Sequence, residues 1–176
     1  MKSLMTERLT LRPVTVTDIT PAYIDALNDP EVVQWTGARH GRWDRARVVD
    51  YVTRCNVEGV SLLLGVFLKE PPKHIGNVRL FHFSRVDQHV ELALMVFDKS
   101  EWSKGYATEA INGVAEYVFH DLGLHRIFAD YYAVNTASAR LFAKAGFTIE
   151  GVFKDHFRVN GRYVDSVRIG KLSDRR

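Results

Sequence analysis

Residues 90–110, VELALMVFDKSEWSKGYATEA, are the part of this chain best suited to bind a phosphate. An alternating apolar stretch is followed by a short polar break, and Lys104 and Gly105 then precede a helical pattern. The N–H groups of a first helical turn lack helical partners, and the helix dipole adds positive charge there. The glycine permits close approach, and the lysine adds a full charge. P-loop spacing is absent, so these residues alone also allow an ordinary strand-to-helix loop.

Glu91 is the acidic residue of the strand-like stretch. Alternation places it on the same face as Met95, among apolar neighbours. A carboxylate deprived of water there would suit a general base that works near neutral pH. The alternative is a structural acid paired with an arginine or a backbone N–H, and the residues leave both open.

The elements around this segment alternate between strands and helices. Strands expected at 61–68, 75–84 and 91–97 are joined by short turns typical of antiparallel hairpins. A helix over 108–122 should end at Gly123, and Thr17 and Asp18 are N-cap candidates for a helix over 19–27. The other expected elements are an edge strand at 7–13, a helix at 44–57, a strand at 126–132, a helix at 136–145, and strands 149–159 and 163–172 joined by Asn160-Gly161. This order favours an α/β or α+β sheet layered with helices, in a single domain over residues 1–176.

The composition, 46% hydrophobic and 26% charged residues, is that of a soluble globular protein. No apolar run approaches the roughly 20 residues that span a bilayer, and the N-terminus lacks a signal-peptide core, so we expect a cytoplasmic protein. The single cysteine, Cys55, cannot form an internal disulfide, and no histidine spacing predicts a metal site. The net charge is +3 without a Lys/Arg-rich run, which makes nucleic-acid binding a weak third hypothesis.

The run SKGYATEA resembles the GNAT superfamily of acyl-CoA N-acyltransferases, together with Trp102 before it and NTASARLF and KAGF after it. The branch it most resembles holds the ribosomal-protein N-terminal acetyltransferases and related sugar and small-molecule enzymes. The similarity extends over residues 6–172. It implies the GNAT fold: a mixed, mostly antiparallel sheet of about seven strands, with helices on both faces and the fourth and fifth strands splayed to admit the pantetheine arm.

The resemblance also implies a reaction, the direct transfer of an acetyl group from acetyl-CoA to a primary amine in a ternary complex without a metal. The acceptor would be a protein N-terminus, an amino sugar or another small-molecule amine. Loop N–H groups would face the CoA pyrophosphate, and the strand end would pair with the pantetheine arm. The chain departs from the family at Trp102, where Gln or Arg is usual, and at Ser103, where glycine is common. The implied cosubstrate-binding residues are Met95, Val96, Phe97, Ser103, Lys104, Gly105, Tyr106, Ala107, Thr108, Asn135, Ser138 and Phe142.

Two residues are the implied catalytic groups, Glu91 as general base and Ser138 as general acid. Asn135 and Ser138 are natural helix N-caps, which is their simpler explanation. In the family the asparagine contacts the cofactor, and the serine can lie near its sulfur. A tyrosine one turn later is the commoner acid, but here that residue is Phe142, which has no proton to give. The general acid is then Ser138, a water or no group at all, and we favour Ser138.

Arg39, His40, Arg42 and Trp43 lie in a loop that often lines the acceptor side in this family. Such a rim would suit an anionic acceptor, such as a nucleotide-linked amino sugar or an acidic peptide, whereas a solvated loop is the simpler alternative. A different class of function also stays open, a non-catalytic CoA-binding sensor module. The sequence leaves the oligomeric state undecided, a homodimer included.

Overall fold

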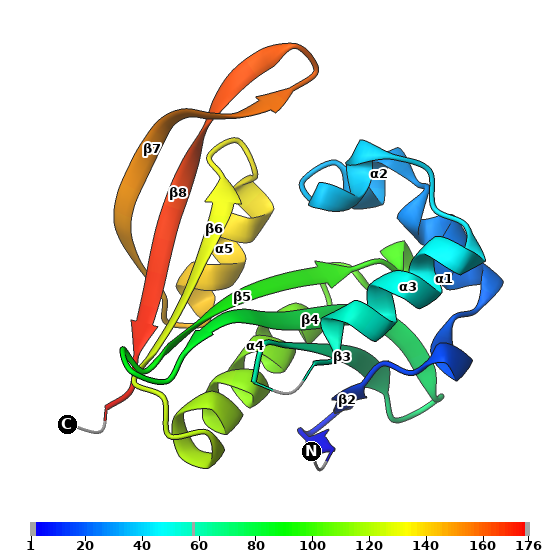
Figure 1. Cartoon of the computed structure of the whole chain (residues 1–176), viewed down its shortest axis with the longest axis horizontal. Coiled ribbons are helices and arrows are strands. Elements are labelled where there is room, and N and C mark those ends of the chain that lie inside the picture. Colours follow the sequence, from blue (N-terminus) through cyan, green and yellow to red (C-terminus); the bar gives the residue numbers. More distant parts are fainter. Residues whose placement is uncertain (1–2, 58, 175–176) are drawn as a thin grey trace.

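One mixed sheet forms the centre of the protein (Figure 1). The computed structural model describes residues 3–57 and 59–174, and within them the sheet has eight strands in the order β1-β2-β3-β4-β5-β6-β8-β7. All neighbours are antiparallel except β5 and β6. The expected fold class is confirmed, with one strand more than expected because Leu4–Met5 pairs with β2. The strands are β1 (Leu4–Met5), β2 (Leu9–Pro13), β3 (Ser61–Leu68), β4 (Lys73–Ser84), β5 (His89–Val96), β6 (Arg126–Tyr132), β7 (Thr148–Val159) and β8 (Arg162–Leu172).

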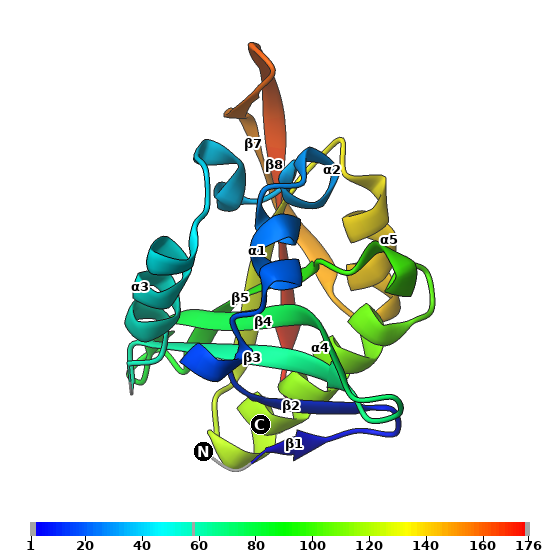
Figure 2. The same cartoon turned by 90° about the vertical axis from the view of Figure 1, so that its right-hand side faces the viewer.

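Helices cover both faces of the sheet, as expected. Because successive strand side chains point to opposite faces, Leu63 and Leu64 of β3 enter different cores. The larger core lies between the sheet and α4 and α5, and the smaller one lies under α1 to α3. Figure 2 shows α3 on one side of the strands and α4 and α5 on the other. The helices are α1 (Pro21–Leu27), α2 (Pro30–Val33), α3 (Arg45–Cys55), α4 (Tyr106–Glu116) and α5 (Thr136–Lys144), with shorter turns η1 (Val16–Asp18), η2 (Gly37–His40), η3 (Lys99–Glu101) and η4 (Tyr117–Asp121).

Several expected boundaries are wrong, each for a local reason. Thr20, and not Thr17 or Asp18, caps α1, since its hydroxyl accepts from Tyr23 N at 3.2 Å. The edge strand expected at residues 7–13 is flanked by β1, and residues 30–33, for which no element was expected, form the short helix α2. The helix after the polar loop begins at Tyr106, two residues early, because Gly105 takes the N-cap position.

Strands β5 and β6 separate, which confirms the expected splay between the fourth and fifth expected strands. Across the described residues they pair only where His89, Val90 and Glu91 lie opposite residues 126–128. Beyond Glu91, β5 stays paired with β4, while β6 stays paired with β8. Figure 1 shows the two strands diverging from this shared start. Glu91 therefore stands at the vertex of the gap.

The last two strands form the expected hairpin. Asn160 and Gly161 both have positive φ, +49° and +80°, as a two-residue type I′ turn requires. The hairpin rises beside β6 and carries its tip toward the region of α2 (Figure 1). Among the helices of the described residues, none is long and apolar enough to cross a membrane.

Candidate active site

The loop between β5 and α4 presents backbone N–H groups at the start of a helix. Gly105 is the N-cap at φ +86°, and its carbonyl oxygen accepts the first helical bond, from Glu109 N at 3.1 Å. The N–H groups of Tyr106, Ala107 and Thr108 precede that bond, and within the described residues no side chain caps them. Ser103 adopts φ +62°, the left-handed conformation that glycine favours, at the position where the resembled family commonly has glycine. The loop can therefore hold an anion through its backbone.

Side chains fix this loop against the sheet. Trp102 Nε1 donates to the carbonyl oxygen of Val96 at 2.8 Å, which ties the loop to the end of β5. Lys104 Nζ lies 2.9 Å from Glu101 Oε2. The positive charge expected from Lys104 is thus shared with a carboxylate.

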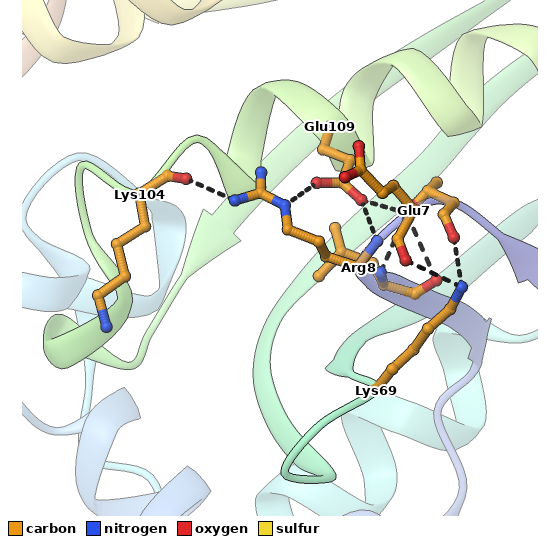
Figure 3. A network of polar contacts seen from close by, with 7 residues as sticks. Glu7, Arg8, Lys69, Lys104 and Glu109 are labelled. Atoms are coloured by element: carbon orange, nitrogen blue, oxygen red, sulfur yellow. Dashed lines mark hydrogen bonds and ion pairs between the residues drawn. The ribbon is translucent and has the colours of Figure 1, made fainter.

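A second cation, Arg8, lies beside the start of α4. Figure 3 shows it between the carboxylate of Glu109 and the carbonyl oxygen of Lys104, at 2.7 and 3.1 Å. Its guanidinium lies 4.5 Å from the ring centre of Tyr106. Burial alone would raise the pKa of Glu109, but hydrogen bonds from Thr6 and Arg8 lower it, so the carboxylate stays charged and holds Arg8 in place. No local pattern predicts the contact of Arg8 with this loop, because Arg8 is 96 residues from the loop residue it contacts.

The edge of β5 that faces the gap is formed by alternate residues. Phe97 N donates to Ile75 O of β4 at 2.9 Å, so the backbone groups of Phe97 and Met95 point toward β4. Those of Leu94 and Val96 point the other way, into the gap. Of the three strand-end residues expected to pair with pantetheine, Val96 alone is oriented for it. The Phe97 ring is buried and stacks on Tyr23 at 4.8 Å.

Glu91 lies opposite Phe81 and Phe128, as apolar neighbours were expected, but it also has a polar neighbour that the alternation does not indicate. Its carboxylate, with 18% of the side chain exposed, lies 2.8 Å from Nδ1 of His82, whose side chain is 72% exposed. His82 reaches Glu91 because β4 bulges between Phe81 and Ser84, where His82 takes φ +51°. Simple alternation does not predict this contact, since it would place His82 on the opposite face from Phe81, the partner of Glu91.

The start of α5 holds the other expected catalytic side chain. Asn135 caps the helix, and its Oδ1 accepts from Ser138 N at 3.1 Å. Asn135 Nδ2 donates to Ser138 Oγ at 2.8 Å. Phe142 is only 6% exposed and packs between Tyr131 and Phe147, with ring centres 6.4 and 5.2 Å away. Phe142 is a core residue, and its expected contact with the cosubstrate stays a prediction.

The loop expected to line the acceptor side contacts the far wall of the gap. Arg39 donates to the hydroxyl of Tyr132, the last residue of β6, and the ring of Trp35 lies 5.5 Å from that of Tyr132. His40 and Arg42 line a cavity between this loop and the tip of the β7–β8 hairpin. Trp43 does not belong to the rim, because its Nε1 donates to Ala38 O at 2.8 Å and its ring packs on the smaller core.

Known proteins are similar to this chain in sequence and in fold. The model of the acetyltransferase (GNAT) domain family matches residues 8–148. An uncharacterized N-acetyltransferase, p20 of Bacillus licheniformis, is 30% identical over 169 residues, which cover 94% of this chain and 93% of p20. The spermidine N(1)-acetyltransferase of Vibrio cholerae is 30% identical over 95 residues, 54% of each chain. A ribosomal L7/L12 alpha-N-protein acetyltransferase, solved in complex with coenzyme A, shares the fold with a TM-score of 0.87 at 15% identity, covering 98% of this chain and 99% of that one.

The chain belongs to the GNAT acetyltransferase family, as its motifs indicated. It is therefore an acyl-CoA-dependent N-acetyltransferase with acetyl-CoA as cosubstrate. The ribosomal-protein branch expected from the sequence is among the proteins that share its fold.

Proposed function

We propose that the protein transfers an acetyl group from acetyl-CoA directly to a primary amine held at the gap between β5 and β6. The observation that carries this proposal is the continuity of the gap. One end has the open amides of the α4 N-terminus, one wall has the free edge of β5, and the vertex has Glu91. A long, thin cosubstrate with a diphosphate and a reactive end fits that order of features.

Binding of the diphosphate falls to the N–H groups of Gly105 and of the first turn of α4, with the Thr108 hydroxyl as a further donor. The pantetheine arm pairs with the backbone of Leu94 and Val96. The N–H of Leu94, which is nearer to Glu91 along β5, is the donor placed to stabilise negative charge that develops on the thioester oxygen. Such positioning provides much of the rate, because a thioester is already reactive.

Glu91 accepts the proton of the acceptor amine, directly or through a water. The hydrogen bond with His82 holds the Glu91 carboxylate in position at the vertex of the gap. At the other side of the gap, Ser138 Oγ already accepts a hydrogen bond from Asn135, so its own proton is available for the leaving sulfur. The acceptor amine thus gives a proton to Glu91, which releases it to solvent. Ser138 gives a proton to the leaving sulfur and regains one from solvent.

Glu91→Gln tests the proposal, because glutamine keeps the shape of the side chain but cannot accept the proton. We expect kcat/KM for the acceptor to fall by roughly 100-fold, with the affinity for CoA unchanged in calorimetry. Glu116→Gln is the matched control, since it removes an acid that is 73% exposed on α4. Unchanged turnover in Glu91→Gln would contradict the role of Glu91.

The rival function is a sensor that binds CoA without turnover, and one observation favours it. The tyrosine that the family commonly uses as an acid is here the buried core residue Phe142. Release of free thiol from acetyl-CoA over a panel of amines separates the two functions. Binding of CoA without thiol release for any amine would favour the sensor.

A further inference from the structure

The cavity beside the acceptor loop has a volume of about 1030 Å³. Its walls are the end of α1, helix α2, the loop that follows it, and the tip of the β7–β8 hairpin. The charged and titratable side chains that line it are Glu31, Arg39, His40, Arg42 and Arg158.

The charges of this cavity are mostly uncompensated. Arg39 bonds to the neutral oxygens of Thr36 and Tyr132. In the part of the chain that the structure describes, the guanidinium groups of Arg42 and Arg158 have no acidic partner. Among the described residues that line the cavity, Glu31 is the only acid, and Lys99 Nζ lies 3.0 Å from its carboxylate. The cavity therefore presents net positive charge.

The cavity is connected to the proposed site of transfer through β6. Phe128 lies opposite Glu91, and Tyr132 is four residues further along the same strand, on the same face. At about 3.3 Å per residue, Tyr132 lies roughly 13 Å from the vertex of the gap. Because Arg39 bonds to Tyr132, the positive groups begin at about that distance from Glu91.

We propose that the acceptor amine carries a carboxylate or phosphate at roughly 13 Å from the reacting nitrogen, a length spanned by about four residues of an extended peptide. Arg39, Arg42 and Arg158 bind that group. This inference rests on the proposed function and narrows its substrate class. A polycation such as spermidine, the substrate named for one relative, would be repelled by the same groups.

Matched acceptor pairs test the proposal. One pair is a peptide with acidic residues at its third and fourth positions and the same peptide with amides there. The other is a 4-amino sugar linked to a nucleoside diphosphate and the free 4-amino sugar, and spermidine is the cationic acceptor. We expect kcat/KM to be about 10-fold or more higher for the anionic member of at least one pair, and this preference should weaken with salt. Preference within the peptide pair or the sugar pair distinguishes the two sources of negative charge.

The variant that tests the residues is Arg42→Gln with Arg158→Gln, since both side chains are exposed and the fold does not depend on them. It should lose about 10-fold in kcat/KM for the anionic acceptor and little for its neutral partner. Arg54→Gln removes a positive charge on α3, away from the cavity, and should change neither value.

Acetylation of neutral acceptors or spermidine as fast as of the anionic ones would overturn this inference and leave the proposed function intact. Calorimetry with the acidic peptide identifies the opposite case, in which the anion site exists but the proposed function is wrong. Binding that depends on Arg42 and Arg158, without acetylation of any amine, would support the anion site and contradict the proposed function.

Discussion

At the residue scale, Ser138 takes part in the cap of α5 and is also the proposed general acid. Its N–H completes the cap of α5, while its hydroxyl oxygen accepts from Asn135. The hydrogen bond from Ser138 N–H to Asn135 Oδ1 does not involve the serine hydroxyl, so replacing the side chain leaves the cap in place. The catalytic role of Ser138 can therefore be tested without loss of the helix start.

We expect Ser138→Ala to lower kcat by about 10-fold or more, because the leaving sulfur loses its proton donor. The KM for acetyl-CoA should change little. Steady-state kinetics measures both values, and Ser138→Thr, which restores a hydroxyl, should recover part of the rate. A kcat that stays the same in Ser138→Ala would assign the proton to water instead.

At the level of elements, the proposed diphosphate site at the α4 N-terminus depends on backbone conformation more than on side-chain charge. Ser103 and Gly105 both adopt positive φ, and within the described residues no side chain caps the first-turn amides that follow them. A left-handed conformation costs a residue with a Cβ about 1–2 kcal/mol, so Ser103 holds this shape against its own preference. Lys104 and Arg8 are both bound to carboxylates, which leaves the amides as the main attraction for a diphosphate.

Gly105→Ala should lower the free energy of unfolding by about 1–2 kcal/mol and weaken CoA binding by roughly 10-fold, since the new Cβ disfavours φ +86°. Urea unfolding and calorimetry measure the two effects. Gly123→Ala is the matched control, because Gly123 has φ +65° at the other end of the helical segment and open space around it. It should lose similar stability but keep its CoA affinity. Equal loss of affinity in both variants would mean that the loop itself is not the binding site.

At the scale of the whole molecule, a partly buried ion pair joins the end of β2 to η1, the turn that leads to the helices of the smaller core. Arg12 at the end of β2 donates to both oxygens of Asp18, at 2.8 and 2.7 Å. Thr15 N donates to the same carboxylate at 2.8 Å. Burial alone would raise the pKa of Asp18, but these hydrogen bonds lower it to about 2. Because the pKa is lower in the folded state, the stabilisation is complete above the unfolded value and is lost as pH falls through about 2.

Asp18→Asn should therefore lower the free energy of unfolding by about 2 kcal/mol near neutral pH. The difference from the unchanged protein should shrink as pH falls below about 4. Urea unfolding over a pH series measures it. Asp50→Asn, which breaks an exposed pair with Arg54, should cost only about 0.5 kcal/mol. A difference that does not depend on pH would show that the Asp18 carboxylate is not the stabilising group.

Most elements could be predicted from the sequence because their signals are local. The core face of α4, the Asn160-Gly161 turn and the strands β3 and β6 depend on residues close together in the chain. The missed boundaries depend on competing local signals. Thr20 outcompetes Asp18 as the cap of α1, because Asp18 is bound to Arg12.

The sequence by itself determined the family, the strand-to-helix loop and the candidate residues Glu91 and Ser138, since motif order and spacing along the chain carry that information. Only the tertiary structure decided what these residues contact. The β4 bulge brings His82 to Glu91, and the crossing of the gap brings Arg39 to Tyr132, 93 residues away. Local patterns do not encode such contacts, because a bulge reverses the face of a side chain and a distant pair forms only when the strands are in place.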